Sequence, residues 1–473
     1  MSTNNLFKED IKIINIGSPS FQQDYEKQNV SYVHLDWSPP AQGNLVVLRQ
    51  LSELRPYLTK IHEANEQAVN KIKSAEGRLI AIKKAFDVIP NMSKNTILHA
   101  GPPIPFSKMA GPMQGAIIGA LIYEGLAKNE KEAIKLAESG AIEFDSAHHH
   151  DAVGPMAGII SASMPVHVIY DIVNRNYSYC TINEGLGKVL RYGANSEEVI
   201  NRLKWIETTF APVMNEALIL SGGIDIKSII TQALHMGDEC HNRNKASSAL
   251  FLREIAVSIL KTSFSDLEKQ EVISFIQKNE HYFLNLSMPY CKVALDAAKN
   301  IKYSTVVTAM ARNGVSFGIR LASSNAWYQA PANYVKGLMF PGFIEDDAAP
   351  DIGDSAITET CGIGGFAMGG APAIVQFVGG VVDQAFDYSK QMHDITHGKH
   401  QVFTLPTLDF MPTALGIDIM KVLETGILPI INTGMAHKKA GIGQVGAGLV
   451  NPPLSCFEKA LEDFVKRIKE DQS

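Results

Sequence analysis

The sequence predicts an α/β and α+β protein of several domains, with a small Rossmann-like unit at the N-terminus, a core rich in Gly and Pro, and a helical subdomain inserted in the middle. Three observations lead to this fold class. A strand–helix–strand pattern opens the chain, small residues dominate many segments after residue 97, and residues 196–300 follow an almost wholly helical pattern. With 473 residues the chain is too long for one core, so several domains of ~100 to 200 residues are expected.

The N-terminal unit is expected to be a small α/β layer. Its predicted elements are a strand at 11–17, a helix at 19–29, a strand at 31–36 and a long amphipathic helix at 46–83. Asp36 has about the spacing at which dinucleotide-binding folds hold a ribose, but the turn after Gly17 lacks GxGxxG. We therefore expect a unit that does not bind NAD.

Four domains follow from the changes in pattern along the chain. They are the Rossmann-like unit with its long helix (1–85), a first core part (86–195), the helical subdomain (196–300) and a second core part (301–473). The core parts are expected to contain helices at 113–128, 129–139, 372–390, 415–425 and 455–470, and strands near 401–405 and 428–433. Asn313-Gly314 suits the turn of a hairpin between two β-like segments.

Composition excludes several classes of partner. The chain has 43 Lys plus Arg against 49 Asp plus Glu, a net charge of -6, without any dense basic cluster, so nucleic acid is not expected. Charged residues make up 19%, which suggests a surface partly covered by other chains, including copies of this one. Neither a signal peptide nor an apolar run of ~18 residues is present, so we expect a cytoplasmic protein without a membrane partner. Five widely spaced cysteines without CxxC predict reduced thiols in or near the core.

The run His148-His149-His150-Asp151 is the most unusual local feature. Consecutive residues cannot all face one point, so at most two of these imidazoles could serve one site. They could transfer protons or polarise a carbonyl, they could ligate a metal, or they could hold a turn by bonding backbone carbonyls. The sequence leaves these alternatives open.

A second polar cluster is HMGDECHNRN at 235–244. In a helix, Glu239 would share a face with both His235 and Arg243 at a spacing of four residues. His235 and His241 are six residues apart, unlike the pair in HExxH, so a zincin-like site is not expected. The cluster is either a helix end with an ion pair or a buried polar network that partners or a ligand must satisfy.

Glycines and arginines supply candidate anion sites. In CGIGGFAMGGAP the amides around Gly364, Gly365, Gly369 and Gly370 could converge on an anion before the predicted helix, or the loop could simply pack tightly. GIGQVGAGLVNPP (441–453) is a second candidate of this kind, and GDSAITET adds Asp354 and Glu359 to the polar groups nearby. Cys361 has no His close in sequence, so we do not expect a nucleophile there. Arg243, Arg312 and Arg320 are the candidate anchors for carboxylate or phosphate, although a strand Arg can also be a solvated edge residue.

Six strings in order resemble the AllG-like family over about residues 10 to 470. They are VHLDWSPPAQG, HAGPPI, HHHDAVGPMAGII, MGDECHNRN, ARNG with FGIR, and GDSAITETCGIGGFAM. The resemblance implies α/β and α+β parts with a Rossmann-like N-terminus and a helical insertion. It also implies a role in purine and allantoin fermentation, where a carbamoyltransferase of three kinds of subunit converts oxalurate and phosphate into oxamate and carbamoyl phosphate. One partner is then an acyl-CoA-synthetase-like protein of the FdrA type, although relatives in other gene settings suggest other carbamoylated or acylated substrates.

The SxRT and HPxQ motifs of ordinary transcarbamoylases are absent, so a carbamoyl-transfer site must be built differently. Our hypothesis assigns phosphate to the Gly364–Gly370 amides, the carbonyl or proton transfer to His149 or His150, and a carboxylate to an arginine. The full set of predicted catalytic residues is His99, His149, His150, Asp151, Glu239 and His241. The predicted substrate- or anion-binding residues are Arg243, Asn244, Arg312, Asn313, Arg320, Gly364, Gly365, Gly369 and Gly370.

Two other functions stay open at this point. The histidine clusters fit a metal-dependent amidohydrolase with a divalent cation, although no cofactor is firmly implied. The low charge and the family's multi-subunit habit fit a non-catalytic scaffold that completes a partner's site.

Overall fold

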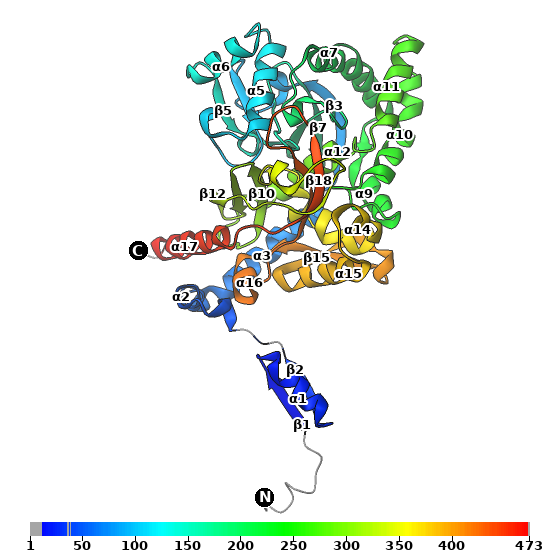
Figure 1. Cartoon of the computed structure of the whole chain (residues 1–473). Helices are drawn as coiled ribbons and strands as arrows, with labels where there is room; N and C mark the ends of the chain where they lie inside the picture. The colour runs from blue at the N-terminus through cyan, green and yellow to red at the C-terminus, as the bar shows by residue number, and fades with distance from the viewer. Residues whose placement is uncertain (1–11, 36, 38, 472–473) are drawn as a thin grey trace, which may run out of the picture.

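Small β-sheets with helices packed around them make up the residues that the computed structural model describes, 12–35, 37 and 39–471 (Figure 1). The fold is therefore mixed α/β, as the sequence predicts. The relation of the N-terminal unit to Rossmann folds and the division into four domains stay predictions.

The N-terminal unit has the expected order of strand, helix and strand. β1 (Lys12–Ile16) pairs in parallel with β2 (Ser31–Leu35), and α1 (Gln22–Lys27) lies between them in sequence. In Figure 1 the unit stands apart from the body of the chain. Asp36, with its ribose-like spacing, lies outside the described residues.

The predicted long helix over 46–83 is wrong. The chain forms α2 (Leu45–Glu53), a 3₁₀ turn at 55–57 and α3 (Leu58–Ser74), and then continues as strand β3 (Gly77–Lys84). Pro56 lies in the 3₁₀ turn, and a proline has no amide hydrogen to continue a helix. The apolar side chains of Leu79 and Ile82 belong to a strand that pairs with a neighbour over its whole length. The helical spacing of apolar residues therefore continued into a segment that forms a strand, because it pairs with a neighbour in the sheet.

The largest sheet has the strand order β6-β8-β7-β3-β9. Besides β3, its strands are β6 (Ala152–Val153), β7 (Pro165–Asp171), β8 (Tyr177–Thr181) and β9 (Ile224–Asp225). β7 is almost wholly buried and pairs antiparallel with both β3 and β8. α8 (Ala211–Ser221) and α12 (Leu284–Asp296) pack against this sheet.

A second sheet, with the order β12-β11-β10-β14, contains the predicted hairpin. Its strands are β10 (Val307–Asn313), β11 (Ser316–Leu321), β12 (Ser324–Pro331) and β14 (Ile352–Gly353). Gly314 has a φ of +80° in the turn after Asn313, a conformation that glycine adopts without strain. The antiparallel pairing of β10 with β11 confirms the hairpin.

The other sheets are small. They pair β4 (Thr96–His99) with β5 (Glu143–Ser146), β18 (Gln444–Val450) with both β13 (Lys336–Met339) and β17 (Ile431–Ala436), and β15 (Thr396–Leu405) with β16 (Met411–Ile417). The strands expected near 401–405 and 428–433 are confirmed in position as β15 and β17, with shifted bounds.

The stretch from 196 to 300 is helical, as predicted. Besides α8 and α12 it contains α7 (Glu197–Trp205), α9 (Ile226–His235), α10 (Lys245–Leu260) and α11 (Asp266–Lys278). Ser265 and Glu268 form a capping box that starts α11. Phe210 and Phe251 of this stretch lie in the same buried core as Ile169 of β7 and Phe403 of β15. The helices therefore share a core with the sheets.

Helices elsewhere follow the predictions in part. They are α4 (Ala85–Val88), α5 (Gly111–Tyr123), α6 (Glu130–Glu138), α13 (Ile357–Thr360), α14 (Val375–Val378), α15 (Val382–Gln391), α16 (Ile419–Thr425) and α17 (Leu454–Glu470). The short α4 and α13 were not predicted. The single helix expected over 372–390 is wrong, because Gly379 and Gly380 adopt positive φ and separate α14 from α15. The predicted helix over 415–425 starts later, since residues up to Ile417 belong to β16.

Two further features of the structure concern the cysteines and the possibility of membrane-spanning helices. All five cysteines are buried and free, as predicted. Among the described residues we find no helix with the length and apolar character needed to cross a bilayer.

Candidate functional site

Asp354 lies at the point where several of the distinctive strings meet. Its fully buried carboxylate accepts hydrogen bonds from the amides of Gly101 (2.7 Å) and Gly154 (2.9 Å). The Nε2 atom of His148 lies 3.4 Å from the same carboxylate. Asp354 therefore joins the HAGPPI turn, the HHHDAVGPMAG segment and the GDSA segment.

Close backbone packing fixes these loops around Asp354. A Cβ atom on Gly101 would lie 2.4 Å from the carbonyl carbon of Arg312, and one on Gly353 would lie 2.5 Å from the amide of Met156. Both glycines also have positive φ. Glycine is therefore required at both positions.

His99 and His148 present two uncharged imidazoles beside this carboxylate. The Nδ1 atom of His99 lies 2.9 Å from the carbonyl of Ala100, so it carries the proton and leaves Nε2 as an acceptor. Burial lowers the pKa of His99. It also lowers the pKa of His148, to about 4, although the nearby negative charge of Asp354 acts to raise it. Nε2 of His99 and both ring nitrogens of His148 are buried without a hydrogen-bond partner among the described residues. The pair can accept protons but is held neutral.

Two cations, Arg320 and Lys292, adjoin the same histidine. Arg320 is 6% exposed, approaches the carbonyl oxygen of His148 at 3.4 Å and stacks its guanidinium over the ring of Trp327 at 5.6 Å. Its guanidinium also donates to the neutral side chain of Asn325 at 3.0 Å, and within the described chain no carboxylate lies at ion-pair distance from it. Lys292 is 1% exposed, pairs with Asp296 at 2.8 Å, and has a pKa that burial lowers to about 8. Arg320 is thus a nearly buried cation without a direct ion-pair partner in the described chain, although the nearby charges of Asp296 and Asp151 partly offset the effect of burial, which lowers its pKa.

The remaining histidines of the run face another carboxylate, Asp145. The Nδ1 atom of His149 lies 2.8 Å from Asp145, and its Nε2 accepts a bond from the indole of Trp327. His150 faces the carbonyl of Pro90 through Nδ1 and Asp145 through Nε2, so both of its nitrogens donate. The bond to Asp145 raises the pKa of His150, which favours the imidazolium.

The backbone of the run separates its side chains. His148 to His150 lie in a 3₁₀ turn, and Asp151 follows with a positive φ and an ion pair to Lys299. His148 therefore faces Asp354 while its two neighbours face Asp145. This agrees with the expectation that at most two of the imidazoles serve one site.

Arg312 and Asn313 are occupied by the protein itself. Arg312 forms a two-pronged ion pair with Asp351 at 2.7 and 2.8 Å, and it also bonds Gly353, Ser355 and Thr433. Asn313 donates to the carbonyl of Pro102 and accepts two backbone amides in the hairpin turn. Their predicted roles in substrate binding stay predictions, and these contacts favour a structural role.

The helical arrangement considered for HMGDECHNRN is wrong, because α9 ends at His235. The carboxylate of Glu239 instead accepts the amides of Asn242 (2.7 Å) and Arg243 (3.0 Å) and the side chain of Asn432 (3.1 Å). Burial raises the pKa of Glu239 to about 7, and the nearby charge of Asp238 adds to the effect. The segment forms a buried polar network, one of the two interpretations left open above.

The network extends through His241 to the predicted anion loop. His241 lies 2.7 Å from Glu359, whose carboxylate also accepts the amide of Gly365. The amide of Gly364 donates to the backbone carbonyl of Glu239, and the amide of Gly369 donates to the hydroxyl of Ser389. A Cβ atom on Gly370 would lie 2.6 Å from the side chain of Leu405. These contacts favour tight packing, and an anion at this loop stays a prediction.

Arg243 and Asn244 complete this second group. Arg243 donates from Nε to the carbonyl of Gly237, and the side chain of Asn244 donates to the carbonyl of His241. The predicted residues therefore fall into two groups, one around Asp354 and one around Glu239. The segment from Asp354 to Glu359 connects the two.

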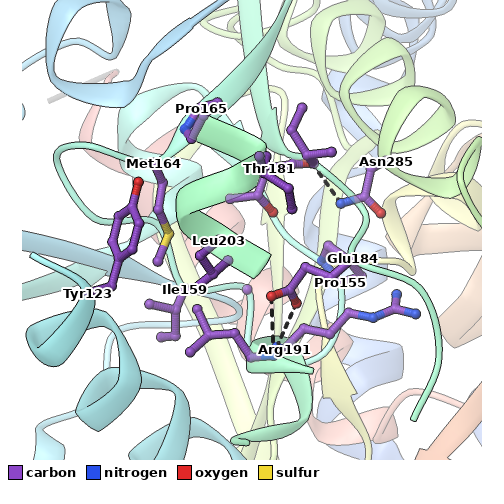
Figure 2. Close-up of a pocket in the computed structure, with 14 residues that line it drawn as sticks. Tyr123, Pro155, Ile159, Met164, Pro165, Thr181, Glu184, Arg191, Leu203 and Asn285 are labelled. Carbon is purple, nitrogen blue, oxygen red and sulfur yellow. Dashed lines mark hydrogen bonds between the residues drawn. The ribbon is translucent and has the colours of Figure 1, made fainter. Parts of the chain in front are cut away.

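Sequence reasoning missed a third feature, which we call the Glu184 pocket. It is lined by Tyr123, Pro155, Gly158, Ile159, Met164, Pro165, Thr181, Ile182, Glu184, Leu190, Arg191, Leu203, Ile206 and Asn285 (Figure 2). Glu184 accepts the amides of Leu190 and Arg191 at 3.2 and 3.3 Å, and burial raises its pKa. The available signal was the string EGLGKVLRYGAN, where the charged residues Glu184, Lys188 and Arg191 lie among glycines and apolar residues.

The loop that carries Pro155 connects this pocket to Asp354. Gly154 donates to Asp354, whereas Pro155 and Gly158 line the pocket and Ala157 donates its amide to the carbonyl of Arg191. Lys292 was also missed, since a Lys in an amphipathic pattern normally indicates a solvated face.

A metal centre has no geometric support in the described part of the chain. No group of three or more His, Cys, Asp or Glu side chains there is arranged to hold a metal ion. His235, which the amidohydrolase hypothesis would use, bonds Thr404 instead.

Comparison with known proteins agrees with the resemblance seen in the sequence. Residues 142–355 match the family described as oxamate carbamoyltransferase subunit AllG. The chain is 47% identical over 98% of both lengths to the uncharacterized protein YahG of Escherichia coli K12. It is 45% identical to the oxamate carbamoyltransferase subunit AllG of the same strain, over 85% of this chain and 97% of that protein. A crystal structure of a conserved protein of unknown function from Enterococcus faecalis V583 is similar too, with a TM-score of 0.85 and 48% identity over 86% of this chain and 98% of that one. The strings that meet at Asp354 and Glu239 are thus part of a wider likeness, and the chain belongs to the AllG family.

Proposed function

We propose that this chain is a catalytic subunit of a phosphate-dependent carbamoyltransferase of the oxamate carbamoyltransferase type. In this reaction oxalurate and phosphate give oxamate and carbamoyl phosphate. An FdrA-like subunit and a third subunit complete the assembly. The name of the related AllG protein supports the subunit role, and the cluster around Asp354 supports a catalytic one.

The observation that carries the proposal is Arg320. A nearly buried guanidinium without a carboxylate partner is costly unless an anion completes it. Arginine binds carboxylate and phosphate through paired donors, and both groups occur in the proposed substrates. The indole of Trp327 holds the guanidinium plane from one side, so a planar anion can approach its edge.

The two neutral imidazoles fit the proton transfers of this reaction. A phosphate oxygen attacks the carbamoyl carbon of oxalurate, the bond from that carbon to the oxamate nitrogen breaks, and the nitrogen takes up one proton. His148 or His99 can accept the proton that phosphate loses and return it to the leaving nitrogen, because each has an acceptor nitrogen without a partner among the described residues. The carboxylate of Asp354 lies 3.4 Å from Nε2 of His148 and favours an imidazolium there as the proton is accepted.

The test is activity in the full assembly. Purified chain, FdrA-like subunit and third subunit should together form carbamoyl phosphate from oxalurate and phosphate. Arg320→Gln should lower this rate by about 100-fold or more, in the range seen when one charge-stabilising donor is removed. Arg49→Gln, which changes an exposed arginine on α2, is the matched control and should keep the wild-type rate. Full activity of Arg320→Gln would refute the site, whereas an assembly that needs this chain but tolerates changes at Arg320, His99 and His148 would indicate a scaffold.

A further inference from the structure

We infer that the exposed face of the N-terminal sheet binds a second copy of this chain. The sheet consists of the two parallel strands β1 and β2, and successive side chains of each strand point to opposite faces. α1 packs on one face, where the ring of Tyr25 lies 5.4 Å from that of Tyr32 and the carboxylate of Glu26 accepts a bond from the Tyr32 hydroxyl. In the described chain no second layer covers the other face.

Four large aliphatic side chains form this uncovered face, which we call the β1–β2 face. Ile14 lies beside Val33 in the parallel register, and Ile16 lies beside Leu35. Their exposed fractions are 66% and 59% for the first pair and 58% and 48% for the second. Parallel sheets are normally covered on both faces, and two strands alone are marginally stable in water. The β1–β2 face is therefore expected to be covered by a partner.

The distribution of charge favours a second copy as this partner. Among the residues of the two strands only Lys12 carries a full charge at neutral pH, and it lies at one end of the face. Two copies can meet face to face around a two-fold axis with their strands antiparallel. The two Lys12 side chains then lie at opposite ends of the contact, about 13 Å apart along the strands, which is beyond the screening length in physiological salt. The face is thus complementary to itself.

The area of the β1–β2 face predicts a weak and reversible dimer. Its exposed apolar surface amounts to roughly 400 Å², a size at which patches on monomers often mark interaction sites. Two copies would bury about 800 Å² in all, which is below the ~1,200 Å² at which stable specific interfaces begin. We therefore expect a Kd on the order of 10–100 µM. In Figure 1 the N-terminal unit stands clear of the body of the chain, so a second copy can reach the face.

Sedimentation velocity of the purified full chain tests the inference. Between about 1 and 300 µM the weight-average mass should rise from 51.6 kDa toward twice that value. Val33→Asp places a carboxylate in the middle of the face, where the contact would bury it, so the Kd should rise at least about tenfold. Gln23→Asp is the matched control, because it adds the same charge to the exposed surface of α1 and should leave the Kd unchanged.

Hydrogen exchange of the wild-type chain locates the contact without any variant, so the test holds even if Val33→Asp impairs folding of the unit. Amides of residues 12–16 and 31–35 should exchange more slowly at about 300 µM than at about 1 µM, because dimer formation stabilises the small sheet. A mass that stays at one chain would overturn the inference, and so would a dimer with unchanged affinity in Val33→Asp. Protection of both strands that does not depend on concentration would overturn it as well. None of these measurements involves the proposed reaction, so the two proposals can fail separately.

Discussion

Replacing Asp351 by Asn should destabilise the fold strongly, because it breaks a buried ion pair. The side chains of Arg312 and Asp351 are both fully buried and are joined by two short bonds. The substitution keeps the shape of the side chain but leaves the guanidinium charge without its counter-charge. Removal of one partner of a buried pair costs about 3–5 kcal/mol. Bonds from Arg312 to Gly353, Ser355 and Thr433 remain, so we expect a value near the lower end, about 3 kcal/mol.

Urea unfolding, followed by tryptophan fluorescence, measures this effect. The matched control is Glu53→Gln, which removes a partly exposed partner of Arg49 and Lys469 and should leave the urea midpoint nearly unchanged. A loss below about 1 kcal/mol for Asp351→Asn, together with weaker binding of phosphate or oxamate, would refute the structural role of Arg312. That result would indicate instead that Arg312 binds the anionic substrate.

Three further predictions concern stability. Glu239 has a pKa that is raised in the folded state, so it binds its proton more tightly there than in the unfolded chain. Stability therefore falls as pH rises from the unfolded value of 4.5 to the folded value of about 7. Glu239→Gln should remove up to about 3 kcal/mol of this decline, which urea titrations at pH 5 and pH 8 would show, and equal pH dependence in both proteins would contradict it. Gly101→Ala should cost about 2 kcal/mol or more, because the new Cβ would meet the backbone of Arg312 at positive φ, and an unchanged melting temperature would be incompatible with this packing. Ser265→Ala should cost about 1 kcal/mol by removing the cap of α11, as judged by hydrogen exchange in its first turn, where unaltered protection would count against the cap.

Local sequence patterns were sufficient to predict the elements whose conformation is determined by their own residues. Asn313-Gly314 predicts a tight turn by its backbone preference alone, and the charged amphipathic pattern of 455–470 predicts α17 within a residue of its start. The long helix over 46–83 failed because spacing cannot tell a helix from a strand that a distant neighbour pairs. β3 depends on its partner β7, which lies almost ninety positions further along the chain.

The candidate site was predictable as a set of strings but not as an arrangement. The sequence identifies His99, Arg320 and the histidine run as candidates because their side-chain chemistry is known from residue type alone, and their roles stay predictions. Which imidazole faces Asp354 depends on the 3₁₀ turn and on the positive φ at Asp151, and no single-sequence pattern specifies either. The burial of Lys292 could not be predicted either, because it results from the packing of α12 on the largest sheet.

The anion loop shows the limit of a composition argument. Consecutive glycines free their amides for an anion and also let other chain segments approach closely, and sequence does not separate these uses. Here Gly364 and Gly365 donate to protein acceptors, and their Cβ positions are filled by Glu359 and Ile430. Only the contacts of the folded chain distinguish the two cases.

The central claim is that the charge of Arg320 binds the anionic substrate during carbamoyl transfer. Chemical rescue tests it most directly, by measuring carbamoyl phosphate formation in the full assembly containing Arg320→Ala, with and without added guanidinium ion. The account predicts a loss of about 100-fold or more, in the range for a lost charge-stabilising donor, and partial recovery that saturates with guanidinium but not with sodium at equal ionic strength. Wild-type activity of Arg320→Ala, or a loss that guanidinium does not reverse in a variant shown to be folded, would contradict it.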